Sequence, residues 1–444
     1  MITENNLALS MIVRDAEEHL RNCLESCKGL VSEIVIGDTG STDQTVSIAR
    51  SFGARIVDVP WTDDFSAARN AVLRSTAADW VLVLDADEML DPGEAVVLAQ
   101  HLRALSTHGY RVPIRNYVLS VRERLWDQPA KTNDSEMPTV KQYPAFVQHE
   151  NVRLFRRDPR IRFTGRVHET VGHSILDAGL QLERSSFSIH HVGMAASEQT
   201  RARKNLLYRR LGMEKIKEMP HDAQAHFELG LVELDNFSNL QEALALFRKA
   251  RRLNAGFPQA WFFEGVALAR MERFSDALDP LLRAEKMGLR NALVAELLGD
   301  TYYNLGRFLD AAGAFRTAMG RDETNPRIRS KAGLAMVRAG SEAAGVEHLR
   351  SAIELAPSDG ELHDRLLQAF VSLDKLGDAA ATAEAKLEAV GNPASTDFLR
   401  AAALWFQLGR LARSSAVLQV GLQMYPQEEK LRTGLTQVLR ADST

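Results

Sequence analysis

Apolar and polar positions follow two different periods along this chain of 444 residues. Up to residue 118, short apolar segments such as LALSMIV and WVLVL alternate with segments of about ten residues whose apolar positions recur at helical spacing. Strands that alternate with helices of this length are typical of right-handed crossovers and of a mainly parallel sheet covered by helices on both faces. The pattern predicts a Rossmann-like α/β fold for this part of the chain, and we place the boundary of the domain, residues 1–195, with the help of the resemblance given below.

From about residue 223 the strand signal disappears and a repeat begins. One position of the repeat is occupied by Gly230, Gly265, Gly299, Gly333, Leu367 and Ala402, at spacings of 35, 34, 34, 34 and 35 residues. Small side chains recur where two helices of one unit must approach closely, at Ala243, Ala277, Ala311 and Ala379. A 34-residue period resembles tetratricopeptide repeats, and it predicts an all-α solenoid of about six units over residues 223–440, the last two more degenerate.

A basic helical pattern, TRARKNLLYRRLGMEKIKEMP, joins the two parts within residues 196–222. The simplest interpretation is a solvated connector helix. The alternative is a face that binds a membrane surface or an anionic substrate, because Lys and Arg gather on it.

Composition narrows the class of protein. The formal net charge of -4 gives no global reason to expect nucleic-acid binding. The N-terminal residues show neither a leader pattern nor an apolar run of about 20 residues, so we expect a cytoplasmic protein without a transmembrane segment. Peripheral attachment at the inner membrane surface through the connector is the alternative. Cys23 and Cys27 are four residues apart in a helical pattern, which favours two thiols on one helix face over a metal site.

Polar loops follow three of the predicted strands: DTGSTD, TDDFSAARN and DADE. In an open parallel sheet these loops converge at one edge, where ligands bind. Asp38 closes one strand, and a carboxylate in that place can accept the N–H of a nucleobase. Asp85 and Asp87 stand at i and i+2 of an extended segment, so they point the same way and can share Mg²⁺ or Mn²⁺ on a diphosphate.

These segments together carry a resemblance. LSMIVRDAEEHLRNCLES, EIVIGDTGSTDQT, DDFSAARN and WVLVLDADE resemble family 2 glycosyltransferases of the GT-A fold, in the branch with C-terminal tetratricopeptide repeats. The resemblance implies that Asp38 binds the base of a nucleotide-sugar donor and that Asp85 and Asp87 form the DxD metal motif. It places Arg69 and Asn70 beside the donor pocket. An ion pair of Arg69 with Asp63 or Asp64 is the structural alternative.

The acceptor side matches the family less closely, because the usual ED motif is absent. FTGRVHETVG and SIHHVG resemble segments of the repeat-bearing branch, which implies Glu169 as general base and His191, or His190, as a further metal ligand. Asp177 and Glu150 are the reserve candidates for the base. Two further expectations concern other residues of this part of the chain. We expect Arg153 and Arg156 to be solvated, and residues 119–150 to form a mobile loop that closes over the substrates.

The resulting function is inverting glycosyl transfer from a nucleotide-diphosphate sugar to a glycan, a lipid-linked acceptor or a peptide or protein. The repeats would bind acceptor or a protein partner, or mediate self-association. The rival from another class is a tetratricopeptide scaffold protein with an inactive nucleotide-sugar-binding domain. A nucleotidyltransferase is disfavoured, since VRDAEEHL stands where a Gly/Lys-rich triphosphate loop is needed.

Overall fold

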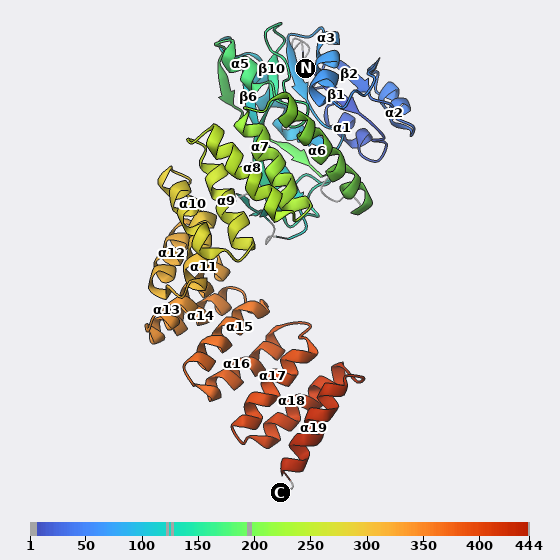
Figure 1. Cartoon of the computed structure of the whole chain (residues 1–444). Helices are drawn as coiled ribbons and strands as arrows, with labels where there is room; N and C mark the ends of the chain where they lie inside the picture. Colours follow the sequence, from blue (N-terminus) through green and yellow to red (C-terminus); the bar gives the residue numbers. More distant parts are fainter. Residues whose placement is uncertain (1–6, 121–123, 126–127, 193–197, 443–444) are drawn as a thin grey trace. The chain divides into compact units, whose positions relative to one another are not determined.

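The computed structural model describes residues 7–120, 124, 125, 128–192 and 198–442. The chain forms two compact units, Met1–Val232 and Glu233–Thr444, and each is described by itself (Figure 1). The N-terminal unit is an α/β structure and the C-terminal unit consists of helices in the part that the structure describes.

The strands of the N-terminal unit are β1 (Leu7–Val13), β2 (Glu33–Asp38), β3 (Arg55–Asp58), β4 (Trp80–Val83), β5 (Glu88–Leu90), β6 (Gly109–Val118), β7 (Arg124–Leu125), β8 (Gln128–Pro129), β9 (Lys131–Thr132), β10 (Ala145–Arg156), β11 (Leu182–Arg184) and β12 (Ile189–His191). The main sheet has the order β3-β2-β1-β4-β10-β6-β12-β5. Strands β3, β2, β1 and β4 are parallel, as the sequence predicts. Strand β10 runs antiparallel to β4 and β6, so the complete sheet is mixed.

The helices of this unit are α1 (Leu20–Ser26), α2 (Thr45–Ser51), α3 (Phe65–Ser75), the short η1 (Pro92–Glu94), α4 (Ala95–Leu102), α5 (Gly172–Asp177), α6 (Glu198–Glu218) and α7 (Ala223–Leu231). Because side chains alternate along a strand, Leu7, Leu9 and Met11 of β1 face α1, α2 and α4. The opposite face is covered by α3 over β2 and by α5 over β4 and β10.

Helix α3 begins where the sequence places a capping residue. Asp64 accepts a hydrogen bond from the Ala67 amide at 2.9 Å, which satisfies one of the free N–H groups of the first turn. The helix then packs so closely on β2 that a Cβ added to Gly37 would lie 2.4 Å from Val72. Glycine at this position therefore sets the height of α3 above the strand ends.

The predicted loop over residues 119–150 is shorter in the structure. Strand β10 begins at Ala145 and pairs with β6, so residues 145–150 belong to the sheet. Strand β9 also pairs with β10. Part of the predicted loop, residues 121–123 with 126 and 127, lies outside the described residues. The prediction of a loop up to residue 150 is wrong, because residues 145–150 pair with residues 113–118 of β6.

Helix α6 corresponds to the predicted connector helix, whose residues 196 and 197 lie outside the described part. One side of the helix is buried, with Leu211 at 0% and Lys215 at 6% exposure. The expectation of a solvated helix is therefore wrong for this side, since it packs within the N-terminal unit.

The C-terminal unit begins within a π-helical turn, η3 (Val232–Asn236), which spans the boundary. Its helices are α8 (Leu240–Leu253), α9 (Pro258–Arg270), α10 (Phe274–Lys286), α11 (Ala292–Asn304), α12 (Phe308–Arg321), α13 (Pro326–Arg338), α14 (Glu342–Leu355), α15 (Gly360–Ser372), α16 (Leu376–Ala389), α17 (Ser395–Gln407), α18 (Leu411–Met424) and α19 (Glu429–Asp442). The repeated small residues mark close helix contacts: a Cβ added to Gly265 would lie 2.5 Å from Leu281, and one added to Gly299 would lie 2.5 Å from Phe315.

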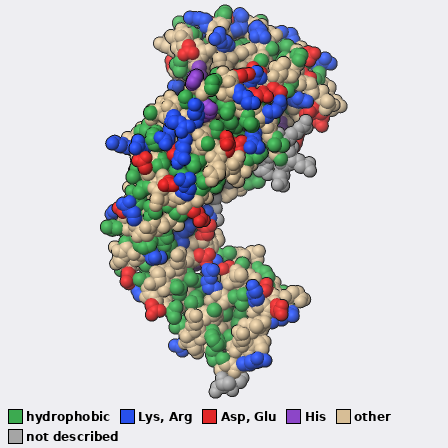
Figure 2. Space-filling model, viewed as in Figure 1, with side chains coloured by type: hydrophobic (Ala, Val, Ile, Leu, Met, Phe, Trp, Pro, Cys, Tyr) green, Lys and Arg blue, Asp and Glu red, His purple; other side chains and the backbone are tan. Residues whose placement is uncertain are grey.

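The surface carries both signs of charge. On the face drawn in Figure 2, outside the grey atoms, acidic and basic side chains lie interspersed. Among the described helices, none combines the length and the apolar character that crossing a membrane requires.

Candidate active site

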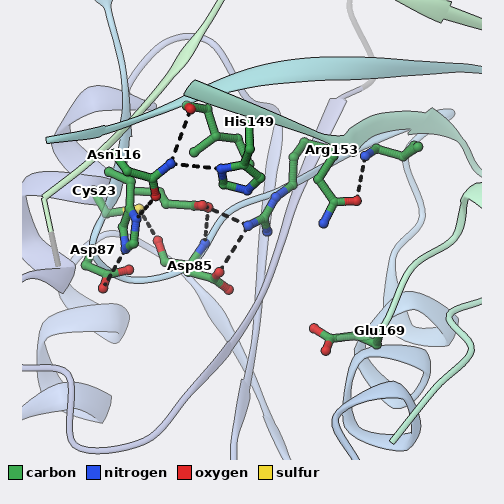
Figure 3. Close-up of polar contacts among 12 residues, drawn as sticks. Cys23, Asp85, Asp87, Asn116, His149, Arg153 and Glu169 are labelled. Carbon is green, nitrogen blue, oxygen red and sulfur yellow. Dashed lines mark hydrogen bonds and ion pairs between the residues drawn. The ribbon is translucent and has the colours of Figure 1, made fainter. Parts of the chain in front are cut away.

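The candidate site lies at the carboxyl ends of β1, β2 and β4, which we call the carboxyl edge. Asp85 and Asp87 follow β4, and Glu88 begins β5. In the view of Figure 3, Asp85 lies between Asp87 and Glu169. The acidic residues that follow the apolar strand in the sequence are thus gathered with side chains from α3, β10 and β12.

Asp85 is held between two arginines. Its Oδ1 accepts a hydrogen bond from Arg69 Nη2 at 2.7 Å, and its Oδ2 accepts one from Arg153 Nη2 at 3.1 Å. Burial favours the neutral acid, but Arg153 and Arg69 outweigh burial and hold the pKa of Asp85 well below its usual range. Asp85 is therefore an ionised and fixed carboxylate.

Glu88 fixes the turn that carries these aspartates. Glu88 is 2% exposed, and its side chain accepts a hydrogen bond from the Asp85 amide at 2.8 Å and pairs with Arg153 at 2.8 Å. Burial raises the pKa of Glu88 to about 7, although Arg153 acts in the opposite direction. Glu88 thus orients both Asp85 and Arg153 from beneath the site.

Asp87 faces His191. The His191 Nε2 and Asp87 Oδ2 atoms are 3.2 Å apart, and His191 Nδ1 is 2.8 Å from Asn116 Oδ1. The amide group of Asn116 is oriented by its Nδ2, which donates to Val147 O at 3.0 Å. Asn116 Oδ1 therefore accepts a hydrogen bond from His191 Nδ1, and Asp87 Oδ2 accepts one from Nε2 of protonated His191. Burial lowers the pKa of His191, but the hydrogen bond with Asp87 outweighs burial and raises it. Loss of the Nε2 proton would leave the lone pair of that nitrogen beside Asp87.

The two adjacent histidines have different places. In β12, His191 is paired with Asn116 and lies opposite Glu88, whereas His190 points to the other face of the sheet. His190 is 3% exposed, its Nδ1 lies 2.7 Å from the Tyr117 hydroxyl, and burial lowers its pKa to about 4. The alternative that His190 serves as the metal ligand therefore disagrees with the structure.

The donor set at Asp87 suits a hard divalent cation held jointly with a ligand. No group of three His, Cys, Asp or Glu side chains within the described ranges is arranged to hold a metal alone. Mg²⁺ is commonly bound by one or two protein ligands, with substrate phosphates and water completing its shell. The carboxylate of Asp87 and the imidazole of His191 fit this arrangement, while both oxygens of Asp85 already contact arginines.

Glu169 is joined to Asp85 through Arg69. Its Oε1 accepts a hydrogen bond from Arg69 Nε at 2.5 Å, and its side chain is 13% exposed. The Nη1 atom of Arg69 is buried and has no hydrogen-bond partner in the part of the chain that the structure describes. The structure thus brings Glu169, Arg69 and Asp85 together across 100 residues of sequence.

The expected alternative partners of Arg69 are used elsewhere. Asp63 forms two hydrogen bonds with Arg210 of α6, at 2.6 and 2.7 Å, and Asp64 caps α3. Asn70, next to Arg69, bonds both the N–H and the C=O of Phe163, at 2.8 and 2.9 Å. In the structure Asn70 holds the segment that leads to Glu169.

Asp38 lies at the end of β2 and is half-buried. Both of its oxygens are near the Ser41 amide, at 3.1 and 3.2 Å. The same loop is tied to the loop after β1, because Asp15 accepts the Thr42 amide at 2.7 Å. Because only β1 lies between β2 and β4, Asp38 follows a strand two positions away from the strand that leads to Asp85 and Asp87.

The prediction that Arg153 and Arg156 of β10 are solvated is wrong. Arg153 is 8% exposed and pairs with Asp85 and Glu88. Arg156 donates to Thr107 O and Ala104 O, at 3.1 and 2.6 Å. Both belong to a strand in the middle of the sheet, where burial requires a partner for every guanidinium.

The reserve candidates for the base lie apart from this cluster. Glu150 pairs with Arg184 at 2.6 Å, and Asp177 is exposed at the end of α5. Sequence reasoning missed Glu88, Arg153 and Asn116 as members of the site. Arg153 and Asn116 reach the site through the register of β10 and β12 with β6, which the sequence does not show. For Glu88 there was a local signal, its position directly after DAD.

The fold and this cluster define a class, an α/β domain with a carboxylate site followed by helical repeats. Residues 10–162 match the sequence profile of Glycosyl transferase family 2, and residues 201–256, 236–290 and 296–360 match that of the tetratricopeptide repeat. The N-terminal unit therefore contains a family 2 glycosyltransferase domain of the GT-A fold, and a tetratricopeptide repeat array follows it.

Individual relatives match parts of the chain. A protein named TPR repeat-containing protein from Synechococcus elongatus is 37% identical over 170 residues, which are 38% of this chain and 36% of that protein. The SPbeta prophage-derived glycosyltransferase SunS from Bacillus subtilis is 23% identical over 252 residues, 55% of this chain and 53% of that protein. The matches thus span about a third to a half of the length of these curated relatives.

A solved structure also aligns with part of the chain. It is described as YrrB, a TPR protein with an unusual peptide-binding site, with a TM-score of 0.36 and 18% sequence identity. The alignment covers 40% of this chain and 91% of that one.

Proposed function

We propose that this chain transfers a sugar from a nucleotide-diphosphate sugar to an acceptor, with inversion at the anomeric carbon. The observation that carries the proposal is the pairing of Asp87 with His191 beside Asp85 at the carboxyl edge of a family 2 glycosyltransferase domain. In an open α/β sheet this edge is where ligands bind.

The donor would lie along the strand ends. Asp38 would accept the N–H of the base, and the diphosphate would reach the DxD segment two strands away. The unpartnered Nη1 of Arg69 supports a contact with a donor oxygen, because a buried N–H without an acceptor is costly. Asp87 and His191 would hold Mg²⁺ or Mn²⁺, which when bound neutralises the charge that develops on the diphosphate leaving group.

Glu169 would be the general base. Its carboxylate, which Arg69 holds in place, would remove a proton from an acceptor hydroxyl or thiol. The oxygen or sulfur then attacks the anomeric carbon from the face opposite the diphosphate, the bond to the diphosphate breaks, and the proton remains on Glu169. Asn70 would position this residue through the backbone of Phe163.

The donor experiment is a screen of nucleotide sugars for hydrolysis in the presence of Mn²⁺. Hydrolysis of one donor should stop when the cation is removed by EDTA and return when Mn²⁺ is added. The variant Asp87→Asn should lose Mn²⁺-dependent binding of the nucleoside diphosphate, measured by calorimetry, while its circular dichroism is unchanged. Asp79→Asn, exposed just before β4, is the matched control. Unchanged affinity in Asp87→Asn would contradict the proposed cation site.

A second candidate function is a scaffold protein whose glycosyltransferase domain is inactive. The observation that favours it is that the carboxylates of Asp85 and Glu169 already form ion pairs with arginines. The cluster is therefore stable without a ligand. The same screen separates the two functions. Hydrolysis of no donor, together with no binding of any nucleoside diphosphate, would favour the scaffold.

The second half of the chain concerns the binding of the acceptor. We infer that the repeat array binds a glycan, lipid-linked, peptide or protein acceptor, or a protein partner, or a second copy of the chain. Stacked repeats form extended surfaces on which such ligands bind, which supports this role.

A further inference from the structure

Helix α6 is fixed to the parts of the unit that carry the candidate site. Arg210 forms its two hydrogen bonds with Asp63 just before α3, the helix that contains Arg69. Lys215 donates to Val167 O at 3.3 Å, and Arg166 pairs with Glu218 at 2.6 Å. Helix α6 is thus tied both to the start of α3 and to the segment that contains Glu169.

Tyr208 stands at the middle of this contact. Its ring lies 6.3 Å from the ring of Phe65, the first residue of α3, and 5.8 Å from the ring of His168. His168 directly precedes Glu169 and has a positive φ of 54°. The side of α6 that contains Tyr208 therefore faces the same space as Glu169.

Lys204 is one turn before Tyr208 on this side of the helix. Its Nζ lies over the Tyr208 ring, 5.6 Å from the centroid. The pKa of Lys204 is raised by Tyr208 and further by the negative charges of Asp87 and Asp85, while burial acts in the opposite direction. Lys204 is thus a cation in the field of the DxD aspartates.

Unlike the arginines of the site, Lys204 has no carboxylate within 4 Å in the described ranges. Arg69 and Arg153 are each bound to two carboxylates. A diphosphate brings negative charge that one divalent cation does not fully balance, and a flexible ammonium is a common partner for phosphate.

On these grounds we propose that α6 forms a wall of the active site and that Lys204 binds the diphosphate of the donor. This inference rests on the proposed glycosyl transfer. It assigns to the helix that joins the catalytic domain to the repeats a direct role in donor binding. Tyr208 acts as a positioning residue, because the Lys204 Nζ lies over its ring, and this ring lies near Phe65 of α3 and His168.

The test is the affinity of the full chain for UDP, GDP, CDP and ADP with Mn²⁺, measured by calorimetry, followed by the matching nucleoside without phosphates. Lys204→Gln should bind its preferred diphosphate about 10-fold more weakly, the effect of losing one charge-assisted contact, and the nucleoside equally well. Lys204→Arg keeps the charge and should retain most of the affinity. Lys217→Gln, exposed on the same helix, is the matched control and should bind like the unmodified chain.

Two outcomes would overturn the inference and are distinguishable. Equal binding of the diphosphate by Lys204→Gln and by the unmodified chain would remove Lys204 from the site and leave the proposed function intact. Failure of the unmodified chain to bind any of the four diphosphates would contradict the proposed function itself and, with it, this role of Lys204.

Discussion

Arg69 makes the positions of Asp85 and Glu169 in the candidate site depend on each other. One guanidinium bonds Glu169 through Nε and Asp85 through Nη2, and the third nitrogen has no partner among the described residues. Because a guanidinium is planar and rigid, a displacement of one carboxylate shifts the other. At the scale of single residues, the site is one connected network rather than a set of separate contacts.

Glu169→Gln tests the base within this network. Turnover should fall by about 10²–10⁴, the usual contribution of general-base catalysis, because an amide cannot take up the acceptor proton. Nucleoside-diphosphate affinity should remain, since Gln can still accept the hydrogen bond from Arg69. Steady-state kinetics and calorimetry measure the two quantities.

Glu150→Gln is the matched control for that variant, because Glu150 is on the same unit and pairs with Arg184 instead. It should keep full turnover. If Glu169→Gln retained near-normal turnover while Glu150→Gln lost it, the role of the base would pass to Glu150.

The sequence predicted the residues of the site that belong to local motifs. Asp85 and Asp87 were visible because an apolar strand ends in acids, and His191 because SIHHVG resembles a segment of the repeat-bearing branch. Arg153 was expected in solvent, since nothing in VRLFRR indicates that its strand inserts between β4 and β6. Contacts made by strand register depend on pairing over long distances in sequence, and a single sequence carries little information about them.

At the scale of elements, glycines allow the paired helices of the C-terminal unit to approach each other closely. Gly299 of α11 faces the Phe315 ring of α12, and Phe315 is 1% exposed. The 34-residue period predicted these contacts because close helix approach recurs once in each unit. The period contains no comparable information on β10, and there the predicted loop was wrong.

Gly299→Ala should destabilise the unit although alanine is the better helix former. The new methyl group would lie 2.5 Å from Phe315, and overpacking of this kind costs about 1–3 kcal/mol. Gly313→Ala, in α12, is the matched control, because no heavy atom lies within 4 Å of its Cβ. It should leave stability unchanged or raise it by up to about 1 kcal/mol through helix propensity. Urea unfolding followed by circular dichroism compares them; equal stability of both variants would contradict a tight contact at Gly299.

At the scale of the whole molecule, the two compact units should separate in function. A chain that ends at Val232 is expected to hydrolyse the donor at the full-length rate but to lose transfer to the natural acceptor. The measurement is incorporation of labelled sugar into macromolecules of the native host, with the full chain as reference. Donor hydrolysis should remain because all residues of the candidate site precede Val232.

The position of the cut matters. A chain that ends at Pro220 would lose Glu228, the partner of Lys215 at 2.7 Å, and Leu229, which packs on Gly212. Helix α6 would then lose both the carboxylate that pairs with Lys215 and the helix that packs on it, which should destabilise the unit. Transfer to the natural acceptor at the full-length rate by the Val232 chain would refute selection of the acceptor by the repeats and favour self-association as their role.

Gly230 has the register of the first repeat, yet its helix, α7, belongs to the compact unit of the transferase. The sequence repeat and the structural unit therefore do not share a boundary. Recombination between genes of this kind would preserve a working transferase only with a crossover after the codon of Val232, inside the first repeat. A crossover at the start of the repeat pattern would replace α7 by a helix of the incoming array, although α7 belongs to the compact unit of the transferase. The first repeat should accordingly be inherited with the enzyme and the later ones exchanged more freely.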